Sequence, residues 1–142
     1  MATFTFFHEF KGNLGEKLID MNGDTFKVAL TNTAPTAATD DELADITQIS
    51  GTNGYTTGGV TLANPSWAET GAGTGVWRFT SDDFSWTASG GDIATFRYLV
   101  LYSDTSTNDK LVGYLDYGGA VNITNGNTFT GDVGASGYFE LG

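Results

Sequence analysis

The chain has 142 residues, the length of one ordinary domain, and it contains 20 glycines but no cysteine. The missing cysteine excludes disulfide bonds, thiolate metal sites and cysteine nucleophiles. The net charge of −11 comes from 17 acidic and 6 scattered basic residues, which argues against nucleic acids and anionic membranes as partners. We therefore expect a single domain, residues 1–142, with an acidic surface.

The N-terminal residues carry an apolar stripe at helical spacing. Its members are Phe6, Phe7, Phe10, Leu14 and Leu18. Because Asn22-Gly23 follows as a typical stop, the pattern predicts an N-terminal helix within residues 1–22. The stripe either packs against the body of the domain or serves as an attachment surface. The segment has neither the basic start of a signal peptide nor the roughly 20 apolar residues of a membrane span.

Residues 24–142 form the β-rich body, in which strands are joined by glycine-rich turns. Alternation at 26–31 predicts a half-buried strand, and residues 96–103, apolar on both faces, predict a central one. Further strands are expected at 45–49, 60–62, 76–80, 82–86, 110–117, 120–124, 127–133 and 137–141. We expect turns at Gly118-Gly119 and at Asn125-Gly126, the latter closing a hairpin. The fold class is mostly β: an antiparallel β-sandwich or barrel-like domain with one N-terminal α-helix.

Residues 49–60, ISGTNGYTTGGV, hold four glycines around Tyr55. Gly54 and Gly59 have the spacing of a phosphate-binding loop, but Val60 stands where that motif requires lysine, and a strand is expected to follow. We expect a tight bend at Asn53-Gly54, and a bulge or a close backbone approach at Gly58-Gly59. Tyr55 is then either a core residue or an interface contact.

The other polar residues predict no reaction centre. The only histidine, His8, lies beside the start of the expected helix and completes no zinc or triad motif. Acidic residues at 40–45 and 82–83 lie in a loop and a turn, where Asp accepts backbone hydrogen bonds. Segments 20–24 and 104–109 offer oxygen ligands for calcium, but neither completes an EF-hand loop. We expect no catalytic residue, no metal and no cofactor, and therefore no enzyme.

The three tryptophans, Trp67, Trp77 and Trp86, complete the candidate interface residues, which also include the apolar stripe and Tyr55. Tryptophan stacks on sugar rings, and it equally fills cores and protein interfaces. Each one lies in or beside a β-like segment, which favours the core or an interface over a displayed sugar platform.

Four long stretches carry a resemblance to a known family. They are DTFKVALTNTAPT (24–36), ADITQISGTNGYTTGGVTL (44–62), FRYLVLYSDTSTNDKLVGYLDYGG (96–119) and GNTFTGDV (126–133). In this order, they resemble a family of small virion structural proteins of tailed bacteriophages, often labelled hypothetical, that includes head-decoration and minor tail proteins. The resemblance is weakest from Ala63 to Asp92, and it supplies no catalytic residues.

The resemblance implies a virion component that is made in the host cytoplasm. We expect a capsid decoration (cement) protein that binds the outer head surface and stabilises the shell. Its partners would be the major capsid protein or other virion proteins, with self-association on the particle and no contact with nucleic acid or membrane. A minor tail or tail-tip protein is the alternative, and a receptor- or glycan-binding module is the second alternative.

Overall fold

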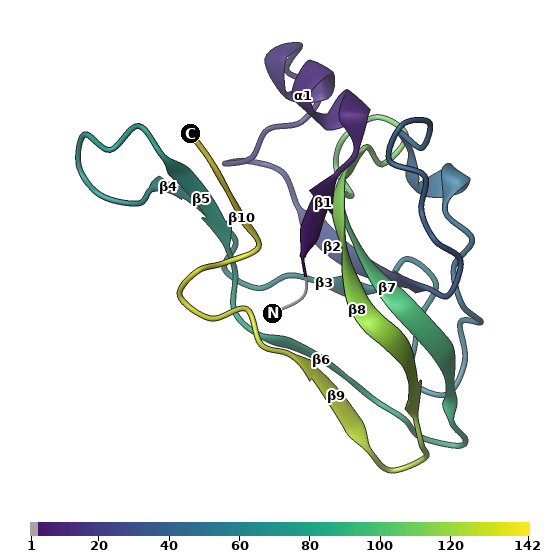
Figure 1. Ribbon diagram of the computed structural model, residues 1–142. Helices are drawn as coiled ribbons and strands as arrows, with labels where there is room; N and C mark the ends of the chain where they lie inside the picture. Colours follow the sequence, from purple (N-terminus) through teal and green to yellow (C-terminus); the bar gives the residue numbers. More distant parts are fainter. Residues whose placement is uncertain (1–2) are drawn as a thin grey trace.

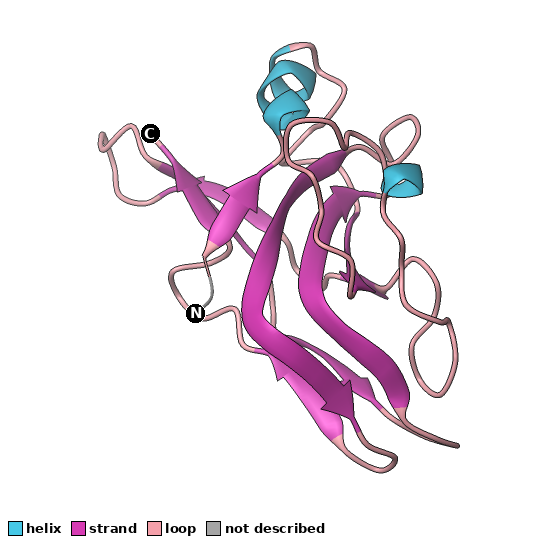
Figure 2. Ribbon diagram, turned by 45° about the vertical axis from the view of Figure 1, so that its right-hand side comes forward, coloured by secondary structure: helices cyan, strands magenta, loops and turns pink. Residues whose placement is uncertain are grey.

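The computed structural model describes residues 3–142 (Figures 1 and 2). Its elements in chain order are β1 (Phe4–Phe6), α1 (His8–Gly15), β2 (Phe26–Thr31), the 3-10 helix η1 (Leu43–Asp45), β3 (Val60–Thr61), β4 (Ser66–Glu69), β5 (Trp77–Thr80), β6 (Phe84–Thr87), β7 (Ile93–Ser103), β8 (Leu111–Ile123), β9 (Thr128–Gly131) and β10 (Phe139–Leu141). The predicted fold class is confirmed: the described chain is mostly β, with antiparallel sheets and a single α-helix near the N-terminus.

The largest sheet has five strands in the order β1-β8-β7-β2-β3. Strand β7 lies at its centre, as the apolar pattern of both of its faces predicts. Antiparallel pairing places Leu30 of β2 opposite Leu99 of β7, and Leu99 opposite Leu115 of β8. These leucines form one apolar row across three strands, and all three belong to the main core. The long, curved β7 and β8 are prominent in both ribbon views (Figures 1 and 2).

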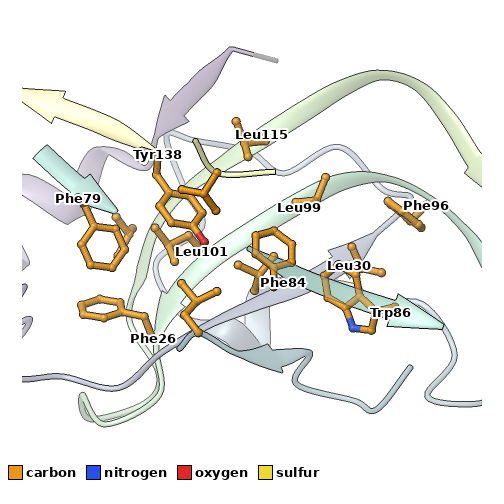
Figure 3. Close-up of a cluster of buried hydrophobic side chains, with 14 of the residues drawn as sticks. Phe26, Leu30, Phe79, Phe84, Trp86, Phe96, Leu99, Leu101, Leu115 and Tyr138 are labelled. Carbon is orange, nitrogen blue, oxygen red and sulfur yellow. The ribbon is translucent and has the colours of Figure 1, made fainter. Parts of the chain in front are cut away.

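Two smaller sheets, β10-β5-β4 and β6-β9, form the second layer of the sandwich. The close-up of the core shows Phe79 of β5 with Phe84 and Trp86 of β6 among the leucines of the large sheet (Figure 3). All three aromatic side chains are buried. Aromatic side chains supply a large apolar area each, so they account for much of the hydrophobic stabilisation of this interface between layers.

A second, smaller cluster covers the other face of the large sheet. It contains Phe7, Ala29, Ile46, Val100, Tyr102 and Leu111. Strand β2 is consequently buried on both faces, with Lys27 its one partly exposed residue. The predicted bounds 26–31 agree with β2, but the prediction that the strand is only half-buried was wrong. Alternation in the sequence does not reveal that the 33–50 segment covers the second face.

The N-terminal helix is shorter than predicted. Within the predicted range 1–22, α1 spans only His8–Gly15, and residues 4–6 form β1, which pairs with β8. Phe6 belongs to this strand, and Phe7 is the residue that caps the helix. Strand pairing prevails here because it gives the backbone of residues 4–6 partners on the edge of the large sheet. Residues 1–2 of the predicted range lie outside the described part of the chain.

Three further local predictions differ from the structure. Gly118-Gly119 is not a turn, because β8 continues through it to Ile123. Asn125-Gly126 is a turn, but it joins β8 to β9, which pairs with β6, so the predicted hairpin does not form. In the predicted strand 45–49, only Gln48 bridges Thr31, and η1 ends at Asp45. Pairing decides each case: β8 pairs with β7 on both sides of the glycine pair, β9 pairs with β6, and Gln48 bridges Thr31. Local patterns do not specify these partners.

Candidate functional site

The acidic residues near η1 hold loops together. Asp45 accepts the backbone N–H groups of Asp41 and Glu42 at 2.9 and 3.1 Å, and these bonds lower the pKa of its carboxyl group. Asp41 and Glu42 also bind the ammonium group of Lys110 at 2.5 and 3.1 Å. The hydrogen bond to Asp41 is the main cause of a raised pKa at Lys110. These contacts fasten the 41–45 segment to the residue that precedes β8.

Acidic residues elsewhere in the chain also accept hydrogen bonds from backbone and hydroxyl groups of other segments. Asp24 accepts the Ser103 hydroxyl at 2.6 Å, and Asp83 accepts the Val133 N–H at 2.9 Å. The bond to Asp83 agrees with the prediction that aspartates at this turn accept backbone hydrogen bonds. His8 is exposed as the first residue of α1. Within residues 3–142, no group of three or more His, Cys, Asp or Glu residues is placed to hold a metal ion.

Tyr55 lies in the core, which selects one of its two predicted roles. Its hydroxyl oxygen accepts the Leu30 N–H at 3.0 Å and donates to the Gln48 side-chain oxygen at 2.7 Å. The same Gln48 oxygen accepts the Gly58 N–H, and the Gly58 carbonyl accepts the hydroxyl of Tyr102 at 2.6 Å. Burial raises the pKa of Tyr55 to about 12 and also raises that of Tyr102. The 49–60 segment is thus fastened to β2 and β7.

The apolar stripe divides between core and surface. Phe7 and Phe10 are fully buried, and Phe6 and Leu14 are partly buried against the main core. Leu18 follows the end of α1 and is 42% exposed. Of the stripe, only Leu18 is therefore available to another molecule over a large part of its surface.

The tryptophans also differ in their surroundings. Trp86 is buried between the layers, whereas Trp67 is partly buried against the core. Trp77 is 41% exposed, and its ring stacks on that of Trp67 with 5.8 Å between ring centroids. Leu18 and Trp77 are thus the exposed members of the nine candidate interface residues.

A pocket of about 480 Å³ opens between β8 and β9, and none of the predicted interface residues lines it. Leu99 and Leu115 of the large sheet and Phe84 of β6 form its floor. The close-up shows these three side chains between the two layers of the sandwich (Figure 3). Phe129 of β9 and the 131–138 segment form its walls. The pocket is therefore a place where the two layers are incompletely closed at their edge.

A large bulge in β8 places Tyr117 at this pocket. In the register between β7 and β8, residues 117–120 lie opposite Arg97 alone. Gly118 has a φ of 92°, a conformation that a residue with a Cβ atom rarely adopts. Tyr117 is 54% exposed, and its ring meets the ring of Phe129 edge-on at 5.6 Å between centroids. Bulges redirect side chains out of a strand's regular alternation, and this one presents a tyrosine to solvent beside an apolar pocket.

An ion pair fixes the shape of the bulge. The Arg97 guanidinium donates to both carboxylate oxygens of Asp116 at 2.8 and 3.1 Å. Asp116 also accepts the Gly118 N–H at 2.9 Å. The hydrogen bond from Arg97, followed by that from Gly118, lowers the pKa of the Asp116 carboxyl group. Because exposed ion pairs add little stability, the main effect of this contact is to orient the chain on either side of Tyr117.

The lining of the pocket determines what it can bind. Apolar and aromatic side chains dominate, and Tyr117, Thr130, Asp132 and Ser136 supply polar groups. Among the described residues, no Lys or Arg lines the pocket. The Tyr138 hydroxyl is already hydrogen bonded to Ser81 at 2.8 Å, and burial raises its pKa. The pocket thus suits an apolar group with a neutral or positively charged neighbour, and it disfavours an anion.

Sequence patterns did not identify this pocket. Its residues come from β6, β7, β8, β9 and the segment that leads to β10, so only the folded register brings them together. One local signal was available. Tyr117 precedes Gly118-Gly119, and a glycine pair inside a strand pattern is typical of a bulge as well as of a turn.

Comparison with known proteins identified no relative: no family model, no curated protein and no solved structure matches the chain. Neither described helix, α1 or η1, has the length and apolarity that a membrane-crossing helix needs.

Proposed function

We propose that the protein is a structural component of a tailed-bacteriophage particle, which binds the outer surface of the head and stabilises the shell. The open apolar pocket beside Tyr117 is the observation that carries this proposal. An exposed tyrosine at the mouth of an apolar cavity is typical of protein-binding surfaces, where aromatic residues dominate the binding energy. The resemblance of residues 24–36, 44–62, 96–119 and 126–133 to virion proteins suggests the type of assembly.

The use of acidic side chains also supports a structural role. Asp24, Asp45 and Asp83 accept backbone or hydroxyl hydrogen bonds that hold loops in place. These carboxylates are therefore occupied in maintaining the fold, which suits a protein that contributes a rigid surface to an assembly.

The stabilising mechanism would be binding to the assembled state. A protein that binds the closed shell, and not its separated subunits, stabilises the shell by RT ln(1 + [L]/Kd) at each site. Because a symmetric shell repeats one site many times, a modest contribution at each site adds up over the particle. Particles that lack the protein should therefore lose their DNA or break at a lower temperature.

The copy number in purified particles tests this proposal. Quantitative mass spectrometry should find on the order of hundreds of copies per particle, as a repeated head site requires. A handful to a few tens of copies would instead favour the tail or tail tip and would contradict binding to the head lattice. Absence of the protein from the particles would reject the proposal entirely.

The stacked Trp67–Trp77 pair favours one second candidate, a glycan-binding module. Trp77 is 41% exposed, and an exposed aromatic ring can stack on a sugar. A glycan array with the purified protein tests this function. Binding that is lost in Trp77→Ala would support it, and an array without signal would reject it.

A further inference from the structure

The pocket between β8 and β9 lies beside unpaired strand edges. β9 pairs with β6 on one side and has no strand partner on the other within residues 3–142. β8 pairs with β1 only at residues 113–115, and beyond them no described strand lies on that side. Phe129, Thr130 and Gly131 of β9 line the pocket, so an unpaired edge and an apolar cavity adjoin each other.

This combination has a recognised use in peptide binding. An extended peptide that adds to a sheet edge gains main-chain hydrogen bonds, and its alternate side chains enter adjoining pockets. Here the gap between the edges of the two layers leaves space for such a side chain above Leu99 and Leu115. Tyr117 and Phe129, whose rings touch each other edge-on, both line the pocket and would contact that side chain together.

Charge narrows the composition of the bound segment. Asp132 is exposed in the pocket lining, to which the described chain contributes no base. Most of the basic residues of the chain are already used in ion pairs within the protein. Four of the six form such pairs: Lys27, Arg78, Arg97 and Lys110. The net charge of −11 also makes a second copy of this chain an unfavourable occupant. A segment with an apolar residue next to Lys or Arg complements both the cavity and its rim.

We propose that this site binds an extended segment of a partner protein, which adds to β9 as a strand. The segment inserts an apolar side chain between β8 and β9 and places a basic side chain beside Asp132. The identification of the partner as a shell protein rests on the proposed function. The strand addition itself follows from the pocket and the free edge.

A pair of matched variants tests the site. Ala135 lines the pocket and is exposed, so Ala135→Trp should fill the cavity without disturbing the core. Ala72 is also exposed in a loop, between β4 and β5, and it does not line the pocket. Ala72→Trp therefore makes the same chemical change at a control position. Both variants should unfold at the same denaturant concentration as the wild type, because neither alters a buried contact.

The probe is a random heptapeptide library selected on the wild-type protein, residues 1–142. We expect enriched peptides that pair an apolar residue with Lys or Arg. Ala135→Trp should weaken their binding at least about tenfold, as expected when a buried apolar side chain loses its pocket, and Ala72→Trp should not. On binding, the amides of residues 128–131 should exchange more slowly with deuterium, because a new strand would cover that edge.

Several results would overturn the inference. They are a library without enriched binders, equal affinity for Ala135→Trp and the wild type, or unchanged exchange in β9 when peptide binds. These results do not depend on any particle, so they are separable from the copy-number test. A peptide site in a protein that is absent from particles would reject the proposed function and leave the strand-addition site standing.

Discussion

The substitution Gly59→Ala should separate two contributions to the stability of the 49–60 segment. Gly59 has a φ of 82°, and its N–H donates to the Thr56 carbonyl at 2.8 Å. An added Cβ atom would overlap the carbonyl oxygen of Val28 in β2. The next residue, Val60, pairs with Val28, so relief of the overlap requires β3 to move away from β2. The change thus combines backbone strain with a steric clash.

Gly73 provides the matched control. Its φ is 78°, and an added Cβ atom would meet nothing within 4 Å. Both substitutions place alanine in the left-handed region, at a cost of about 1–2 kcal/mol. Only Gly59→Ala adds overpacking against the backbone, which costs about 1–3 kcal/mol more. The difference between the two variants should therefore be about 1–3 kcal/mol of unfolding free energy.

Urea unfolding followed by tryptophan fluorescence measures this difference, since Trp86 is buried and reports on the core. The midpoint for Gly59→Ala should lie clearly below that for Gly73→Ala, with similar slopes. If both variants lose the same stability, the close approach of Gly59 to β2 does not contribute as described, and the account of this segment is wrong.

Three further effects on stability are expected. Tyr55→Phe should cost about 1–3 kcal/mol in urea unfolding, because it leaves the buried Leu30 N–H without its acceptor; an unchanged midpoint would contradict this. Burial raises the pKa of Tyr55 above its unfolded value of about 10, so stability should be full below pH 10 and fall as the pH rises towards about 12. Titration in urea should show this fall, and a smaller one in Tyr55→Phe. Lys110→Met should cost about 1–2 kcal/mol at neutral pH, because Asp41 and Glu42 then lose their shared cation. The hydrogen bond to Asp41 raises the pKa of Lys110, so the wild type should lose this stabilisation, and its difference from Lys110→Met should shrink, as the pH rises through that raised pKa. A loss that is constant with pH would argue against this ion-pair explanation.

Strands with a clear pattern of apolar residues, either continuous or alternating, could be predicted from the sequence. Residues 96–103 are apolar on both faces and form part of the central β7, and the alternation at 26–31 marks β2. Asn53 and Gly54 take the positive φ angles that their turn chemistry predicts. These predictions succeed because the determining interactions are local or depend on burial alone.

The helix boundary and the pocket required long-range information. Phe6 and Phe7 fit a helical stripe, yet Phe6 packs against the main core, whereas Phe7 belongs to the opposite cluster. That alternation is typical of a strand, and it becomes decisive only once β8 offers a pairing edge. Tyr117 and Leu115 line the pocket because of the bulge in β8 and the position of the neighbouring β9. No spacing in the sequence predicts that β8 and β9 meet at this pocket.

Binding of the added protein to particles from which it is missing tests the central claim most directly. The wild type and Ala72→Trp should each restore on the order of hundreds of copies per particle, as a repeated shell site requires. At subsaturating concentration, Ala135→Trp should bind at least about tenfold less, because its pocket is filled. Failure of the wild type to bind, or equal binding by all three proteins, would contradict a shell protein that docks through the pocket between β8 and β9.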